Sequence, residues 1–135
     1  MAYITQEEKQ KLAPVIKAIC KKYGVKGSLS IRHYSTLVLT VSSGSIDFIT
    51  NYNKLASQRP SPSGMINLAK DYLDVNTHWY QEHFDGKAKQ FLDEIIPAMK
   101  GPGWFDKSDI QSDYFHTKHY IDVNIGRWNK PYQVI

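Results

Sequence analysis

Two histidines and an aspartate near the carboxyl end of the sequence have the residue types of a metal site. Asp113, His116 and His119 could supply two imidazoles and one carboxylate, a set that binds several divalent metals. A spacing of three places the two histidines on opposite faces of a strand, so the site would need a turn between them. Aspartates in such segments commonly stabilise turns and cap helices. A metal-dependent enzyme is therefore only the third hypothesis, and we name no metal, other cofactor or catalytic residue.

The same part of the chain is rich in aromatic side chains interleaved with aspartates. Tryptophan, tyrosine and arginine dominate the energetics of protein interfaces. The segments 104–116 and 127–132 are therefore predicted to form a surface that binds a protein. The predicted contact residues are Trp104, Phe105, Asp106, Asp109, Asp113, Tyr114, His116, Arg127 and Trp128. The alternative is that these aromatic rings close one end of a hydrophobic core, and at least one of the two tryptophans is expected to do so.

Positive charge is concentrated in the first part of the chain. Residues 1–60 contain nine Lys and Arg against three acidic residues, a net charge of +6, whereas residues 61–135 have eight against ten. A basic helix face could lie along phosphates, which makes nucleic-acid binding the alternative function. The residues that would contact the phosphates are Lys9, Lys17, Lys21, Lys22, Lys26 and Arg32. An ordinary solvated helix face has the same pattern, and the net charge of +4 for the whole chain is modest.

Helical periodicity predicts two main helices. The first is expected over residues 5–23, where Thr5 and Glu8 form a capping box and an apolar stripe includes Ile16 and Ile19. Pro14 predicts either a kink in this helix or a later start near residue 13. The second is expected over residues 85–100, capped by Asp85. A shorter helix is expected behind Ser45, with a further strand as the competing interpretation.

Alternating apolar residues predict the strands. Two strands over residues 28–41 are joined by a short turn at 34–35, and a second turn is expected at 42–44. Further strands are predicted near residues 72–76 and 119–125, and the segment 57–64, rich in proline and serine, is expected to be a loop. This order predicts one α+β domain over residues 1–135, a small antiparallel sheet with two main helices packed on one face.

Composition excludes several classes of protein. The chain is 41% hydrophobic and 22% charged, as folded domains are, and no apolar run is long enough to span a bilayer. Because Cys20 is the single cysteine, the chain cannot form an intramolecular disulfide. Cys20 falls within the first predicted helix, beside its apolar stripe, and is expected to pack as a small hydrophobic residue. The start of the sequence lacks the features of a secretory signal. An intracellular location is therefore expected, with no membrane partner.

Three stretches of the sequence resemble a domain family found in the large polyvalent proteins of phages and conjugative elements, and in small free-standing proteins of mobile elements. They are GSLSIRHYSTLVLTVSSGSIDF, YLDVNTHWYQEHFDGKAKQFL and WFDKSDIQSDYFHTKHYIDVNIGRWNKPY. The resemblance covers most of residues 12–132, and its most specific part is the last stretch. It implies a protein without established enzymatic activity that acts in the cytoplasm of a bacterial host, including against host defences.

The leading hypothesis from the sequence is thus a small intracellular protein that binds a host macromolecule, a protein in preference to a nucleic acid. Self-association is left open, because the strand that ends at Gly126 could pair with a second copy if it lies at a sheet edge.

Overall fold

The computed structural model describes residues 3–58, 68–101, 104, 119–127 and 129–135. Its first helix, α1 (Gln6–Lys22), begins behind Thr5, whose hydroxyl oxygen accepts a hydrogen bond from the backbone N–H of Glu8 at 3.0 Å. The predicted cap is thus confirmed, and the carboxylate of Glu8 accepts a further hydrogen bond from the Thr5 hydroxyl. Pro14 lies inside α1, so the later start near residue 13 is wrong.

Strands β1 (Val25–Arg32) and β2 (Thr36–Gly44) form the predicted antiparallel hairpin. Its turn is tighter than expected from the residue types. Both central residues, His33 and Tyr34, have positive φ angles of 55° and 59°, and the N–H of Ser35 donates to the Arg32 carbonyl at 3.2 Å. Positive φ at both positions is the geometry that favours Asn and Gly, so this turn stores backbone strain.

The sheet is mixed, with strand order β1-β2-β4-β3, and this corrects the prediction of an antiparallel sheet. Strand β4 (Tyr120–Ile125) runs parallel to β2, and β3 (Leu73–Val75) is antiparallel to β4. The short β5 (Gln133–Val134) adds to the end of β2, also in parallel. A parallel neighbour needs a long crossover, which here is the helical segment between β2 and β4.

The remaining helices belong to that crossover. They are α2 (Phe48–Gln58), α3 (Tyr80–His83) and α4 (Gly86–Lys100). The helix expected behind Ser45 is thus confirmed as α2, and α3 was not predicted. The turn expected at 42–44 is wrong: these residues belong to β2, where the register shifts by one residue opposite Lys26 and Gly27. Most of the predicted loop at 57–64 lies outside the described residues.

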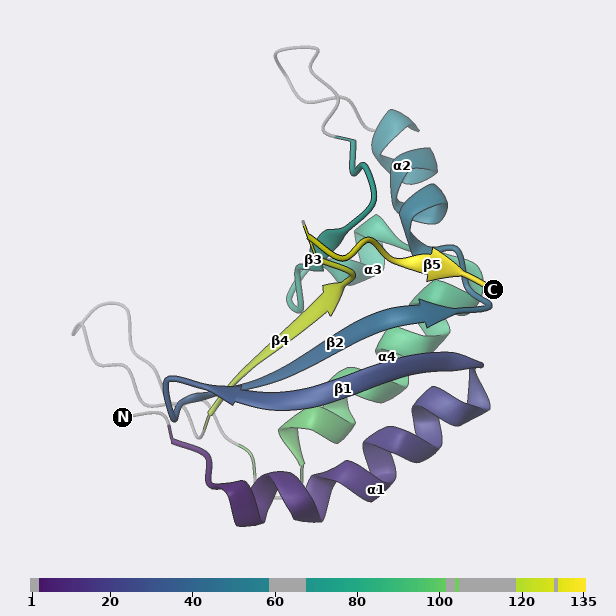
Figure 1. The fold of residues 1–135 in the computed structure, drawn as a ribbon. Coiled ribbons are helices and arrows are strands. Elements are labelled where there is room, and N and C mark those ends of the chain that lie inside the picture. Colours follow the sequence, from purple (N-terminus) through teal and green to yellow (C-terminus); the bar gives the residue numbers. More distant parts are fainter. Residues whose placement is uncertain (1–2, 59–67, 102–103, 105–118, 128) are drawn as a thin grey trace, which may run out of the picture.

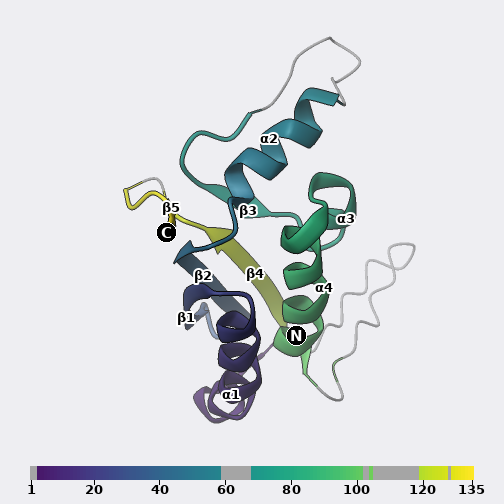
Figure 2. The ribbon, with the colours of Figure 1, turned by 90° about the vertical axis from the view of Figure 1, so that its right-hand side faces the viewer.

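Helices α1 and α4 lie side by side on one face of the sheet (Figures 1 and 2). The apolar positions of β2 and β4 that face them are almost fully buried, as their alternation predicted. These residues are Leu37, Leu39, Val41, Val123 and Ile125, packed with Phe91, Leu92 and Ile95 of α4. The α+β class, with the two main helices on one face, is therefore confirmed. No helix among the described residues is long and apolar enough to cross a membrane.

Candidate functional site on the open face of the sheet

The second face of the sheet, turned toward the viewer in Figure 1, has no described helix over it. Strand alternation decides which side chains it carries, because residues paired across the strands point to the same side. We call this surface the open face. Its residues are Ser28, Ser30 and Arg32 of β1, Thr36, Val38 and Thr40 of β2, Tyr120, Asp122 and Asn124 of β4, and Asp74 of β3.

An ion pair crosses the middle of the open face. The Arg32 guanidinium on β1 reaches Asp122 on β4, with 3.0 Å between Nη1 and Oδ2, so the two side chains span the intervening strand β2. Val38 is the β2 residue opposite Asp122, and it is only 5% exposed although no described helix covers it. The ion pair thus joins the two strands that lie on either side of Val38.

A second arginine lies at the far end of the same face. Gly126 follows β4 with a φ of +70°, and a Cβ atom there would lie 2.5 Å from the backbone nitrogen of Tyr132. Only glycine fits this reversal of the chain. Reciprocal backbone hydrogen bonds between Arg127 and Lys130 then fix the next turn, and Arg127 donates from Nη2 to the Thr40 hydroxyl at 3.3 Å.

Between the two arginines the open face is hollowed into a groove of about 490 Å³. Its lining includes Ser30, Arg32, Val38, Tyr72, Asp74, Asn124 and Arg127. Burial raises the pKa of the Asp74 carboxyl, the negative charge of Asp122 raises it further, and Arg32 acts in the opposite sense. Charges of both signs are therefore held close together beside an apolar floor.

Neither a metal-ligand cluster nor an exposed thiol is present among the described residues. In the part of the chain that the structure describes, no three His, Cys, Asp or Glu side chains are close enough to hold a metal ion. Cys20 is buried, and burial raises the pKa of its thiol, which leaves it a poor nucleophile. A hollow lined by two arginines, a tyrosine and the Asp74 carboxylate has residue types that are common in protein interfaces.

The sequence-predicted protein surface is only partly described. Phe105, Asp106, Asp109, Asp113, Tyr114, His116 and Trp128 lie outside the described residues. Trp104 and Arg127 are described, and the structure places them at opposite ends of β4. Of these two, Arg127 alone lines the groove of the open face.

Trp104 is half-buried beside the start of β4, and its closing of one end of the core stays a prediction. Its indole N–H donates to the backbone carbonyl of His119 at 2.8 Å, and the Lys100 ammonium lies 4.5 Å from its ring centroid. His119 itself is 2% exposed, with its Nε2 3.0 Å from the Met99 carbonyl oxygen. That contact makes His119 part of the core; its two partners in the metal hypothesis, Asp113 and His116, are not described.

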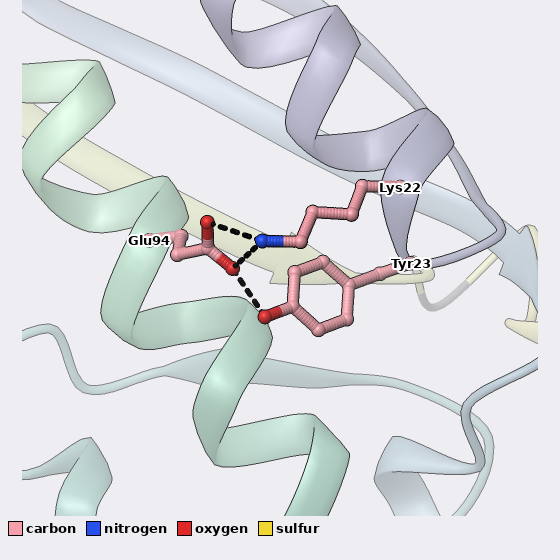
Figure 3. Close-up of polar contacts among 3 residues, drawn as sticks. All are labelled: Lys22, Tyr23 and Glu94. Atoms are coloured by element: carbon pink, nitrogen blue, oxygen red, sulfur yellow. Dashed lines mark hydrogen bonds and ion pairs between the residues drawn. The ribbon is translucent and has the colours of Figure 1, made fainter.

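The six cations of the nucleic-acid hypothesis do not share one surface. Arg32 belongs to the open face, and Lys9 is half-buried in the first half of α1. Lys22 donates to both carboxylate oxygens of Glu94 on α4, at 2.9 and 3.1 Å, and the Tyr23 hydroxyl donates to the same carboxylate (Figure 3). These donors lower the pKa of Glu94, so this cluster ties α1 to α4. The other three of the six cations line one groove; they are Lys17, Lys21 and Lys26.

Sequence motifs indicated only part of the open-face groove. Tyr72, Asp74, Asp122 and Asn124 were not predicted as site residues. The signal that could have found them is strand alternation: in each predicted strand, the polar residues between the buried ones must point to the face away from the helices. Arg32 was predicted in a basic set with the α1 lysines, yet it follows Ile31 in that alternation and belongs with the polar face.

Comparison with known proteins does not show a family. No family model matches the chain, and no solved structure matches it. A parthenolide synthase from Tanacetum parthenium is 26% identical over 89 residues. The match covers 66% of this chain and 17% of that protein, so the chain spans only a small part of its relative. The resemblance to the phage and mobile-element family therefore stays a prediction.

Proposed function

We propose that the chain is a protein-binding module whose open face contacts another protein. The observation that carries the proposal is the groove between Arg32 and Arg127, a hollow lined by charges of both signs on a sheet face without a described cover. The charges of Arg32 and Arg127 are balanced by Asp74 in the groove and by Asp122, which pairs with Arg32. This balance favours a protein surface of mixed charge over the uniformly negative surface of a nucleic acid. The family resemblance implies that this partner is a bacterial host protein.

The fixed positions of the two arginine side chains also support specific recognition of a partner. The Arg32–Asp122 pair and the Arg127–Thr40 hydrogen bond fix both guanidinium groups before any partner arrives. A side chain that is already ordered loses less conformational entropy on binding. Tyr72, which lines the groove, is 42% exposed, and Tyr120, on the open face at the start of β4, is 48% exposed. Such rings are the common anchors of protein interfaces.

Site-specific photo-cross-linking in bacterial cells tests this proposal. A photoreactive phenylalanine analogue at Ser30, in the groove, should yield a discrete cross-linked protein. The same analogue at Lys87, an exposed residue at the start of α4, serves as the matched control. A product that forms from Ser30, is absent from Lys87 and is lost in an Arg127→Glu background supports the open face. Equal products from both positions would overturn it.

A further inference from the structure

A second surface, distinct from the open face, lies between α1 and the outer edge of β1. Among the described residues β1 pairs only with β2, so its other edge has unpaired backbone N–H and C=O groups. Beside that edge is a groove of about 460 Å³, which we call the basic groove. Its floor is apolar and is formed by Ile16, Cys20, Val25, Leu29 and Leu39.

Three lysines line the basic groove. Lys17 and Lys21 are one turn apart on α1, and Lys26 is in β1. Among the described residues none of the three has a carboxylate within ion-pair distance, whereas Lys11 and Lys22 on the same helix do. The groove therefore has an uncompensated positive charge next to an apolar floor. Its complement is a segment that is acidic and apolar at once.

A glycine lies on the β1 side of this floor. Gly27 has no side chain, and a Cβ atom there would lie 3.0 Å from Leu39 Cδ1 and 3.2 Å from the Thr40 carbonyl oxygen. The absent side chain leaves room for Leu39, which is 1% exposed and lines the base of the groove. A strand added to β1 would place alternate side chains on this floor, which is the geometry of β-strand addition.

We propose that the basic groove binds an extended, acidic segment of a partner protein, which pairs with the edge of β1. Charge disfavours a second copy of this chain, because two β1 edges in register would bring both sets of three lysines together. Single-stranded nucleic acid is disfavoured because the lining residues include no aromatic ring on which a base could stack. The proposal is independent of the open face and adds a second contact to the proposed function.

Fluorescence anisotropy with a labelled, end-blocked peptide as long as β1, in which Glu alternates with Val, tests the proposal. Lys17→Glu with Lys21→Glu should weaken this binding about tenfold, because two surface ion pairs become repulsive. Lys54→Glu with Lys87→Glu changes the net charge equally on α2 and α4 and should change the affinity less than about twofold. The variant with Lys17→Glu and Lys21→Glu should instead bind a peptide in which Lys replaces Glu. Binding of that peptide would show that the variant is folded.

A separate control tests whether the backbone of the peptide pairs with the edge of β1. Methylation of alternate amide nitrogens in the Glu-Val peptide should abolish binding, because those nitrogens can no longer donate to β1. Unchanged affinity of the methylated peptide would overturn strand addition. Equal weakening by both pairs of lysine substitutions, no binding of the acidic peptide, or tighter Lys17- and Lys21-dependent binding of a single-stranded oligonucleotide would overturn the proposed partner. A photo-cross-link at Ser30 can persist in each of these cases, so the two proposals fail separately.

Discussion

The open face and the basic groove share strand β1 but differ in how their cations are compensated. On the open face, Arg32 pairs with a carboxylate across β2 and Arg127 donates to a hydroxyl. In the basic groove, Lys17, Lys21 and Lys26 have no such partner among the described residues. Fixed arginines suit recognition by shape and hydrogen bonding, whereas free lysines act as point charges that attract an acidic partner. One strand thus borders two kinds of binding surface.

The largest expected effect on stability comes from a substitution at Gly126, where the chain reverses at the end of the open face. Gly126→Ala should lower the free energy of unfolding by about 1–3 kcal/mol, because alanine at φ +70° is strained and its Cβ meets the Tyr132 backbone. Urea denaturation measures the change. Gly86→Ala is the matched control, since Gly86 also has a positive φ, +57°, but has no atom within 4 Å of the added Cβ. An equal loss in both variants would show that the close approach to Tyr132 is unimportant.

A smaller effect, of the opposite sign, is expected at the turn that joins β1 to β2. Tyr34→Gly should raise the free energy of unfolding by about 1 kcal/mol, since glycine adopts the φ of 59° without steric cost. Thermal unfolding measures it. Ser30→Gly, within β1, should instead lower stability because glycine weakens a strand interior. A destabilised Tyr34→Gly protein would mean that the exposed tyrosine ring contributes more than the turn strain costs.

The cluster that holds α1 beside the basic groove should give an acid-dependent loss of stability. The pKa of Glu94 is lowered by its hydrogen bonds from Tyr23 and Lys22. A lowered folded-state pKa gives stability that is present above the ordinary value of 4.5 and is lost as the pH falls through the folded value. Glu94→Gln should therefore reduce the fall in urea midpoint below that pH. Glu7→Gln, which removes an exposed carboxylate 3.8 Å from Lys11, should leave the profile nearly unchanged.

The smallest expected effect is a change in the pKa of Asp74 on the open face. Asp122→Asn removes a negative charge that raises the pKa of Asp74 and frees Arg32, which lowers it. The pKa of Asp74 should therefore fall, as measured by carbon-detected NMR titration of its carboxyl group. Asp93→Asn, on α4 behind the sheet, should leave it unchanged. If the pKa of Asp74 did not change in the Asp122→Asn variant, the charge of Asp122 would have no effect on Asp74.

Local patterns predicted most elements because local physics decides them. The alternation around Leu37 and Leu39 and around Ile121 and Val123 required two half-buried strands, and the Thr5 cap required a helix start. Parallel pairing of β2 with β4 could not be predicted, because their register depends on packing between segments about 80 residues apart in sequence. The predicted turn at 42–44 failed for the same reason, since Gly44 is held in the sheet by Val25 and Val134.

The candidate site was harder to predict than the fold. Arg127 was named from its residue type, but its position over Thr40 depends on the reversal at Gly126 and the backbone bonds to Lys130. Lys22 was placed among the phosphate-binding residues because nothing near it in sequence indicates Glu94 as its partner. Residue type and spacing show which groups are present, whereas tertiary contacts decide which charges are compensated.

The position of β2 in the sheet has a consequence for folding during synthesis. β2 bonds to β1 on one side, but its other neighbours, β4 and β5, come from residues 120–134. The hairpin of β1 and β2 can form early, while the second edge of β2 stays unpaired until those residues leave the ribosome. During that interval a nascent chain exposes an apolar strand edge. Truncation before residue 120 should therefore yield aggregation-prone and protease-sensitive fragments.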